Sequence, residues 1–285
     1  MMSIKKYIHF LNIKKQYPVW GTVFVFLALL SCNKKEEVPS PGQRYISNNS
    51  QAGVAITFDD DYVKEWYAVN SILKTYDWKA TFFVCEFNKL SLKELNELKS
   101  LKQHGHEIGG HGWVHLKAAP FEESHGEVNY LDKEIFPMLT RMKEKSFPVH
   151  SFAYPYGSRD AVTDTILLHE FNIIRGTTYG KEPPAEQKCY FDDESRVLFG
   201  LGIDNNYPQF SIPYFLSLLD YAKKHNKIVV FYAHKPVLKA KSKYETEYKT
   251  LIAICKYVKE HQMKFYTVSE LYLKERHKDK IGFGY

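Results

Sequence analysis

Cysteine is scarce in this chain of 285 residues, and none of its 4 cysteines stands in a CxxC pair. The sequence therefore lacks a structural zinc knot. It also lacks an internal repeat, a GxGxxG run and a P-loop, so we do not expect a nucleotide cofactor. Hydrophobic residues make up 44% of the chain and charged residues 25%, which excludes a disordered, collagen-like or coiled-coil protein.

An excess of one charge sign is confined to the N-terminus. The net charge is +6, but the first 31 residues contain four lysines and no acid. Without those lysines, 35 basic and 33 acidic residues remain, a net charge of +2. No basic patch stands out in the sequence, so we do not expect nucleic acid as a partner.

The apolar run near the N-terminus is too short to cross a membrane. It covers 12 residues, 19–30, whereas a spanning helix needs about 20. It follows a lysine-rich stretch and ends at Ser31, which is typical of a signal peptide. The string Leu29-Leu30-Ser31-Cys32 resembles a bacterial lipoprotein box, which implies that Cys32 is acylated and anchors the mature chain to a membrane. An ordinary signal peptide with an incidental cysteine is the alternative.

The segment after Cys32 indicates a tether. Residues 33–37, Asn-Lys-Lys-Glu-Glu, resemble a tag that sends some lipoproteins to the outer surface of Gram-negative cells. That resemblance implies an exported, surface-exposed protein of the outer membrane; a solvated tether is the alternative. We therefore divide the chain into a signal peptide (1–31), a lipidated cysteine with a flexible linker (32–52) and a folded domain (53–285).

The remaining cysteines are Cys85, Cys189 and Cys255, an odd number that indicates no disulfide framework. Cys85 lies in an apolar run and Cys255 on an apolar helical face. We expect both in the core.

Short apolar runs alternate with helical patterns from residue 53 onward. We expect strands at 54–58, 80–84, near 107–108, and at 151–154, 172–176, 227–232 and 264–267. We expect helices at 62–76, 91–104, 127–145 with a kink or break at Pro137, 160–169, 211–225, 244–261 and from 268. This alternation predicts a parallel α/β fold, either a barrel or a doubly wound sheet. In both, chemistry gathers at the carboxyl ends of strands.

Three adjacent carboxylates, Asp59, Asp60 and Asp61, follow the first strand. Such carboxylates repel one another and need a cation or a proton to coexist. The alternative is that one of them caps the helix that begins near Tyr62 while the others face water.

Histidines and aromatic residues follow other predicted strands. His111 and His115 are four residues apart, so a helical turn would place both imidazoles on one face, where they could share a metal ion. His106 lies at the start of the preceding strand, and we expect it to be structural. His234 ends the strand at 227–232, and 152–157 ends another strand in a Pro-Tyr-Gly turn. Two histidines and one carboxylate on one ion make a facial triad with open positions, which suits metal-activated water or oxygen chemistry.

The order of these motifs resembles the polysaccharide deacetylases with the NodB-homology domain, from about Val54 to Leu273. The resemblance rests on Thr57-Phe58-Asp59-Asp60, Ala80 to Val84, Glu107-Ile108-Gly109, His111-Gly112-Trp113-Val114-His115, Pro155-Tyr156-Gly157 and Tyr232-Ala233-His234. It implies that residues 53–285 form a distorted, incomplete (β/α) barrel with fewer than eight repeats, acting as a catalytic domain.

The resemblance also implies roles for these residues. Asp59 is the catalytic base and His234 the general acid. Asp60, His111 and His115 are the ligands of one divalent ion, with zinc favoured and cobalt or nickel as alternatives. The backbone N–H of Tyr156 helps to hold the oxyanion. Trp113, Tyr154, Tyr156 and Tyr207 are candidates to stack on sugar faces; the alternative is that most of them are core residues.

Several positions depart from the family pattern. Asp61 replaces a glycine, Gly112 a serine or threonine that can brace the histidine loop, and Tyr232 a leucine of the acetyl pocket. Ala153 stands where many members have an arginine that orients the base, and Arg159 and Arg175 are candidates to replace it. The fourth motif is poorly matched, with Asp204 as the candidate that tunes the acid histidine.

The function implied is metal-dependent removal of acetyl groups from a carbohydrate polymer, either from the nitrogen of amino sugars or from an oxygen ester. The acetylated polysaccharide is then the partner, together with the membrane through Cys32. The departures motivate an alternative, a glycan-binding surface lipoprotein that has lost catalysis. A facial-triad iron oxygenase is disfavoured by the strand–helix alternation.

Overall fold

The computed structural model describes residues 51–273. The predicted signal peptide, Cys32 and nearly all of the predicted linker lie outside the described residues, as do residues 274–285. Within 51–273, no helix is both long enough and apolar enough to cross a membrane.

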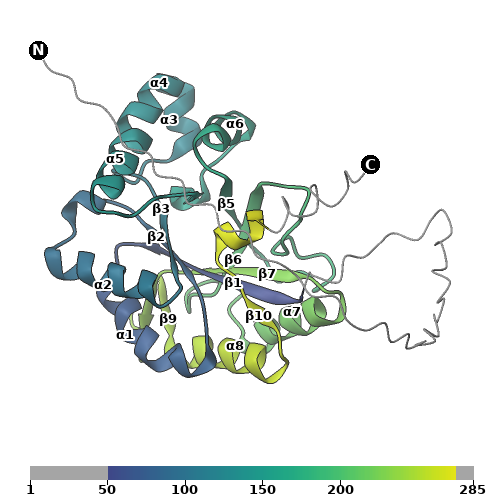
Figure 1. The fold of residues 1–285 in the computed structure, drawn as a ribbon. Coiled ribbons are helices and arrows are strands. Elements are labelled where there is room, and N and C mark those ends of the chain that lie inside the picture. The colour runs from purple at the N-terminus through teal and green to yellow at the C-terminus, as the bar shows by residue number, and fades with distance from the viewer. Residues whose placement is uncertain (1–50, 274–285) are drawn as a thin grey trace, which may run out of the picture. The chain divides into compact units, whose positions relative to one another are not determined.

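Parallel strands form a closed ring (Figure 1). The strands are β1 (Gly53–Asp60), β2 (Thr81–Val84), β3 (Glu107–Gly110), β4 (Ser151–Ala153), β5 (Ile173–Thr178), β6 (Val197–Gly202) and β7 (Ile228–Ala233). They pair in chain order, and β7 pairs back with β1, so the ring closes. β10 (Lys264–Phe265) pairs with the first two residues of β1. The predicted (β/α) barrel with fewer than eight repeats is confirmed, and the doubly wound alternative is wrong.

Helices lie on the outside of the ring (Figure 1). They are α1 (Val63–Leu73), α2 (Leu92–Gln103), α3 (Ala118–His125), α4 (Glu127–Tyr130), α5 (Phe136–Glu144), α6 (Ala161–Glu170), α7 (Ile212–Lys224) and α8 (Tyr248–Glu260). Short 3-10 turns occupy η1 (Lys74–Tyr76), η2 (Phe87–Lys89) and η4 (Pro155–Gly157), and a π-helical turn occupies η3 (Leu131–Ile135). β8 (Lys235–Val237) and β9 (Glu245–Glu247) form a separate parallel pair.

Most predicted elements are present, and local chemistry explains their ends. α2 begins with a complete capping box, in which Ser91 and Glu94 bond each other's backbone N–H. The expected break near Pro137 is the π turn η3, which separates α4 from α5. The helix predicted from 244 begins only at Tyr248, because residues 245–247 form β9.

Apolar residues fill two layers. The larger cluster, which includes Trp66, Phe82 and Phe215, lies between the strands and the helices. The smaller one includes Ala55, Phe83 and Val230, which share alternate positions on their strands and fill the inside of the barrel. Cys85, Cys189 and Cys255 are buried free thiols, which confirms the core positions predicted for Cys85 and Cys255.

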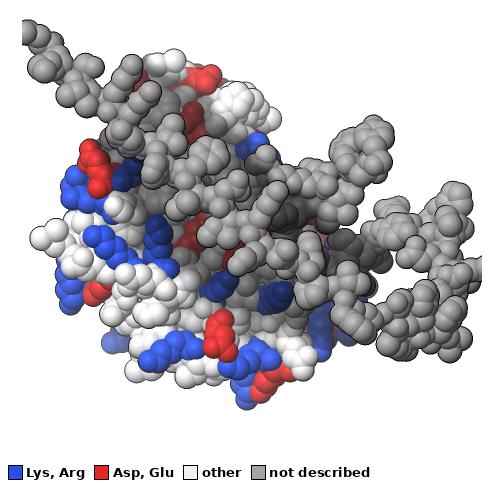
Figure 2. Space-filling view, viewed as in Figure 1, with Lys and Arg blue, Asp and Glu red and all other residues white. Residues whose placement is uncertain are grey.

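Charge is mixed over the surface. On the face in Figure 2, lysines and arginines are interspersed with acidic residues wherever the described surface is visible. This agrees with the small net charge of the chain beyond its N-terminal lysines.

Strand β6 was not predicted, because glycines interrupt its apolar pattern. Gly200 and Gly202 occupy alternate positions on it. A Cβ on Gly202 would lie 2.5 Å from the Tyr207 ring and 2.9 Å from the Tyr232 ring. A Cβ on Gly200 would lie 3.3 Å from Tyr232 and 3.4 Å from Arg175. The missing side chains therefore make room for large residues from neighbouring parts of the barrel.

We expect Gly202→Ala to lower the free energy of unfolding by about 1–3 kcal/mol, because the methyl group overpacks the rings of Tyr207 and Tyr232. Urea denaturation measures this. Gly200→Ala is the matched control, and a smaller loss is expected there because its contacts are longer. Equal stability of Gly202→Ala and wild type would show that the rings can move aside freely.

Candidate active site

The predicted site residues come from the carboxyl ends of five strands. Asp59 and Asp60 end β1, the histidine loop follows β3, and Tyr156 lies in η4 directly after β4. Asp204 follows β6 and His234 follows β7. Because all strands of the ring are parallel, these ends meet at one edge of the barrel.

Asp60, His111 and His115 form a cluster that can hold one metal ion. The Asp60 Oδ1 atom lies 3.6 Å from Nε2 of His111 and 3.4 Å from Nε2 of His115. The two Nε2 atoms are 3.2 Å apart. Zinc bonds of about 2.0–2.1 Å in tetrahedral geometry place donors roughly 3.3 Å apart, so the spacing fits one ion.

The tautomer of His111 also fits a ligand. Its Nδ1 lies 2.8 Å from the carbonyl oxygen of Ala153, an atom that can only accept a hydrogen bond. Nδ1 therefore carries a proton, and in neutral His111 the lone pair is on Nε2, the atom that would bind the ion. Such a carbonyl partner is the usual support for a metal-binding histidine.

Asp60 is held ionised in this cluster. Burial alone would raise its pKa, but the contacts with His111 and His115 outweigh burial and lower the pKa below its usual range. Its φ angle of 84° is in the left-handed region, which is unusual for aspartate and typical of strained functional sites. At the neighbouring Asp61, which is exposed, partial desolvation and then the charges of Asp60 and Glu86 raise the pKa.

Two local expectations are wrong. α1 begins at Val63 without any side-chain cap, so none of the three carboxylates caps it. His111 and His115 do not share a helical turn, because residues 111–117 form an irregular loop. Gly112 with φ of 90° and His115 with φ of 61° bend this loop, and the bend brings the two imidazoles together.

Asp59 is buried against an arginine. Both carboxylate oxygens lie 2.5 Å from Nη2 of Arg175, whose side chain is fully buried. The guanidinium also lies over two rings, 5.5 Å from the centre of Phe83 and 5.1 Å from that of Tyr232. Tyr232, the predicted departure in the acetyl pocket, thus forms one wall for the arginine.

Arg175 is the arginine that the sequence left undecided. It is the register partner of Ala153 on the adjacent strand, so its side chain enters the barrel beside the position where family members have arginine. Arg159, the other candidate, pairs instead with Asp164, which also accepts a hydrogen bond from Tyr154. Arg159 therefore tethers the loop after β4 to α6.

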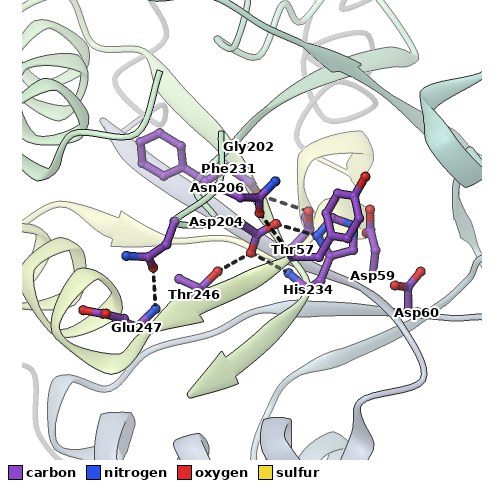
Figure 3. A network of polar contacts seen from close by, with 12 residues as sticks. Thr57, Asp59, Asp60, Gly202, Asp204, Asn206, Phe231, His234, Thr246 and Glu247 are labelled. Atoms are coloured by element: carbon purple, nitrogen blue, oxygen red, sulfur yellow. Dashed lines mark hydrogen bonds and ion pairs between the residues drawn. The ribbon is translucent and has the colours of Figure 1, made fainter. Parts of the chain in front are cut away.

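Asp204 and His234 form a second buried pair (Figure 3). Nδ1 of His234 lies 2.6 Å from Oδ2 of Asp204, and the His234 backbone N–H donates to Oδ1 at 3.2 Å. Asp204 is fully buried, and the Thr246 hydroxyl on β9 also donates to it. In Figure 3, Asp59 and Asp60 lie on the side of His234 away from Thr246.

His234 is favoured in its protonated form. Burial alone would lower its pKa, but the hydrogen bond and charge of Asp204, together with the charges of Asp59 and Asp60, raise the pKa overall. Its backbone is fixed as well, because Nε1 of Trp66 donates to its carbonyl at 2.8 Å. Trp66 was not singled out in the sequence, since it reads only as a core residue of α1.

Aromatic residues surround the site. The Tyr156 ring lies 4.6 Å from the His115 ring and is 61% exposed, and the backbone at Tyr156 has φ of 59°. The Tyr244 ring lies 5.0 Å from the His234 ring and is also exposed. Tyr207 and Trp113 are half-buried. Tyr154 is fully buried, so it cannot stack on a sugar as we expected.

One residue missing from the predicted site, Glu134, bears on its geometry, whereas His106 does not. Sequence patterns alone did not reveal Glu134, a fully buried acid on η3 whose carboxylate contacts the histidine loop. His106, which we expected to be structural, is buried away from this site between Asn70 and Ala80, and burial lowers its pKa to about 4.

Comparisons with known proteins agree with this architecture. The profile of a family described as polysaccharide deacetylase matches residues 47–169. A gellan lyase from a Bacillus species is 25% identical over 150 residues, which are 52% of this chain and 6% of that protein.

Solved structures share the fold. The Xyl-CE4 domain of a multidomain xylanase, from the hindgut metagenome of Trinervitermes trinervoides, matches with a TM-score of 0.52 at 19% identity, covering 79% of this chain and 91% of that one. The chitin deacetylase of the fungal pathogen Colletotrichum lindemuthianum matches with a TM-score of 0.51 at 16% identity, covering 78% and 88%. Residues 47–169 are therefore similar to the polysaccharide deacetylase family, and the chain shares the (β/α) barrel fold of these two structures.

We expect Arg175→Met to cost about 3–5 kcal/mol of unfolding free energy, because it leaves the Asp59 carboxylate buried without a partner. Adding Asp59→Asn should recover much of that loss, since no buried charge then remains. Urea denaturation of the two single variants and the double variant measures the coupling. Arg159→Met is the matched control, with a smaller loss expected at its partly exposed pair. Simple additivity of Arg175→Met and Asp59→Asn would contradict the pairing.

Proposed function

We propose that this protein removes N-acetyl groups from the amino sugars of a polysaccharide by metal-dependent hydrolysis. One observation carries the proposal: the Asp204–His234 pair and the Asp60, His111 and His115 cluster lie at the same edge of one barrel, with Asp59 beside Asp60 at the end of β1. A hydrolase of this type needs a base, an acid and a Lewis acid at one place.

Each residue has a role that its surroundings support. A divalent ion, which we infer to be zinc, would be held by Asp60, His111 and His115, and would polarise the acetyl carbonyl and lower the pKa of a water molecule. Asp59, oriented by Arg175, takes the proton of the attacking water. The backbone N–H of Tyr156 donates to the oxygen of the former carbonyl as negative charge develops there.

The surroundings of His234, the proposed general acid, favour an amide substrate. An amine leaving from an N-acetyl sugar must be protonated, whereas an alkoxide leaving from an acetyl ester depends less on an acid. His234 is held by its side chain, its N–H and its carbonyl, and Asp204 raises its pKa, which favours the protonated form. An ester substrate would not require the Asp204–His234 pair. The presence of this pair therefore supports N-deacetylation.

Exposed rings at the mouth support a sugar polymer as substrate. Tyr156, Tyr179 and Tyr244 are 61%, 55% and 46% exposed, although tyrosine rings are usually more buried. Tyr156 lies against the metal cluster and Tyr244 against the acid, so sugar rings on either side of the reacting acetyl group could pack on them.

We further infer export and anchoring through an acylated Cys32, with residues 33–52 as a tether to the outer membrane surface. This inference rests on the sequence pattern of residues 1–37 alone. A domain tethered outside the cell would meet an external glycan as its substrate.

We expect acetate release from N-acetylglucosamine oligomers by the full-length, zinc-loaded protein in detergent, and loss of at least about 100-fold in Asp59→Asn, because no other group takes the proton. Peptidoglycan fragments and O-acetyl xylan complete the substrate panel. Asp61→Asn is the matched control, since this neighbouring carboxylate is exposed and retained activity is expected. Metal binding and sugar binding without acetate release from any substrate would favour the glycan-binding alternative.

We expect Asp204→Asn to shift the alkaline limb of the rate profile to lower pH. Asp204 raises the pKa of His234, so wild type keeps the protonated acid to higher pH and loses activity only as pH rises through that pKa. Thr246→Val should move the limb less, because the Asp204 charge remains. Initial rates across pH at saturating zinc measure both, and an unmoved limb in Asp204→Asn would show that His234 is not the acid.

A further inference from the structure

The loop that carries the two histidines has no regular secondary structure to stabilise its conformation. Its residues, 111–117, form neither helix nor strand. Gly112 and His115 both have positive φ, a conformation that is uncommon for residues other than glycine. The approach of the two Nε2 atoms therefore depends on contacts from outside the loop.

Glu134 supplies three of those contacts, and it alone binds the N–H groups next to His115 in the described structure. Its Oε1 accepts the N–H of Leu116 at 2.7 Å, and its Oε2 accepts the N–H of Val114 at 2.9 Å. Its backbone carbonyl accepts the N–H of Trp113 at 3.0 Å. One residue thus binds the N–H groups on both sides of His115 and a third one nearby.

The backbone around Glu134 is built to place it there. Pro137 has no N–H for the carbonyl of Lys133, and the helix passes this point with a π turn in which the Phe136 N–H bonds to Leu131. Such turns are frequent at functional sites. The Glu134 side chain is fully buried, and its position requires glycine at 112, because a Cβ there would overlap its carboxylate.

We propose that Glu134 is the positioning residue of the metal site, which holds His115 at the distance from His111 and Asp60 that one ion requires. The inference rests on the metal site of the proposed function. Gly112 and Glu134 depend on each other. Because Gly112 has no side chain, the Glu134 carboxylate fits beside the loop and binds its N–H groups. This replaces the hydroxyl side chain that Gly112 lacks.

The test is metal binding by the full-length protein in detergent, measured by Co²⁺ absorption and by calorimetry with Zn²⁺. Glu134→Gln keeps the size of the side chain but presents an NH₂ group to one of the two loop N–H groups. We expect about 10- to 100-fold weaker binding, as for other residues that orient metal ligands. We also expect a changed spectrum of bound Co²⁺, because the ligand geometry changes.

Two further variants keep the result decisive. Glu134→Asp retains the charge but shortens the reach, so positioning predicts weak binding there too, and preserved affinity would overturn the proposal. Asp132→Asn, on the exposed side of the same π turn, is the matched control and should bind as wild type does. Thermal unfolding of the metal-free variants, followed by circular dichroism, identifies a temperature at which all are folded, and metal binding is measured at that temperature.

The outcomes separate this inference from the proposed function. Wild type that binds no metal overturns both. Wild type that binds metal while Glu134→Gln and Glu134→Asp bind equally well, with the same Co²⁺ spectrum, overturns the role of Glu134 alone. Lower thermal stability of these variants with unchanged affinity and spectrum would assign Glu134 to folding only, and also overturns it.

Discussion

Two adjacent carboxylates at the end of one buried strand repel each other, so each needs its own cationic or hydrogen-bonding partner. The rest of the site follows from this constraint. The Asp59 carboxylate contacts Arg175 inside the barrel, and the Asp60 carboxylate contacts His111 and His115 at its edge. Successive residues of a strand point to opposite sides, which would keep the two carboxylates apart without further help. The left-handed backbone at Asp60 adjusts its side chain toward the cluster.

Two departures from the family pattern are compensated by residues from neighbouring elements. Ala153 leaves the base without an arginine on its own strand, and Arg175 enters from the register-paired position on the next. Its buried guanidinium needs space and a polarisable wall, which Gly200 and Tyr232 provide. At the other end, the missing side chain of Gly112 is matched by Glu134. In both cases a side chain from a neighbouring element takes over the contacts of the missing one.

The site combines rigid and strained parts. Strand ends fix Asp59, Asp204 and His234, and Asp204 binds both the side chain and the backbone of His234. The loops that carry His115 and Tyr156 have left-handed residues instead, so their geometry depends on packing and hydrogen bonds from elsewhere. Polar groups that such loops leave buried must be satisfied, and on the histidine loop Glu134 does so.

Local patterns determined much of this protein: the strand–helix alternation, the capping box of α2, the break at Pro137 and the motif order. That order placed Asp59, Asp60, His111, His115 and His234 after predicted strands and singled out Asp204. β6 was missed because its glycines hide a buried strand. Whether Arg159 or Arg175 faces Asp59, whether the histidine pair is helical, and what braces it were decided only by the tertiary structure. The reason is physical: hydrogen bonds and ion pairs depend on distances across strands far apart in sequence, and no local pattern records which side chain closes a gap left by another.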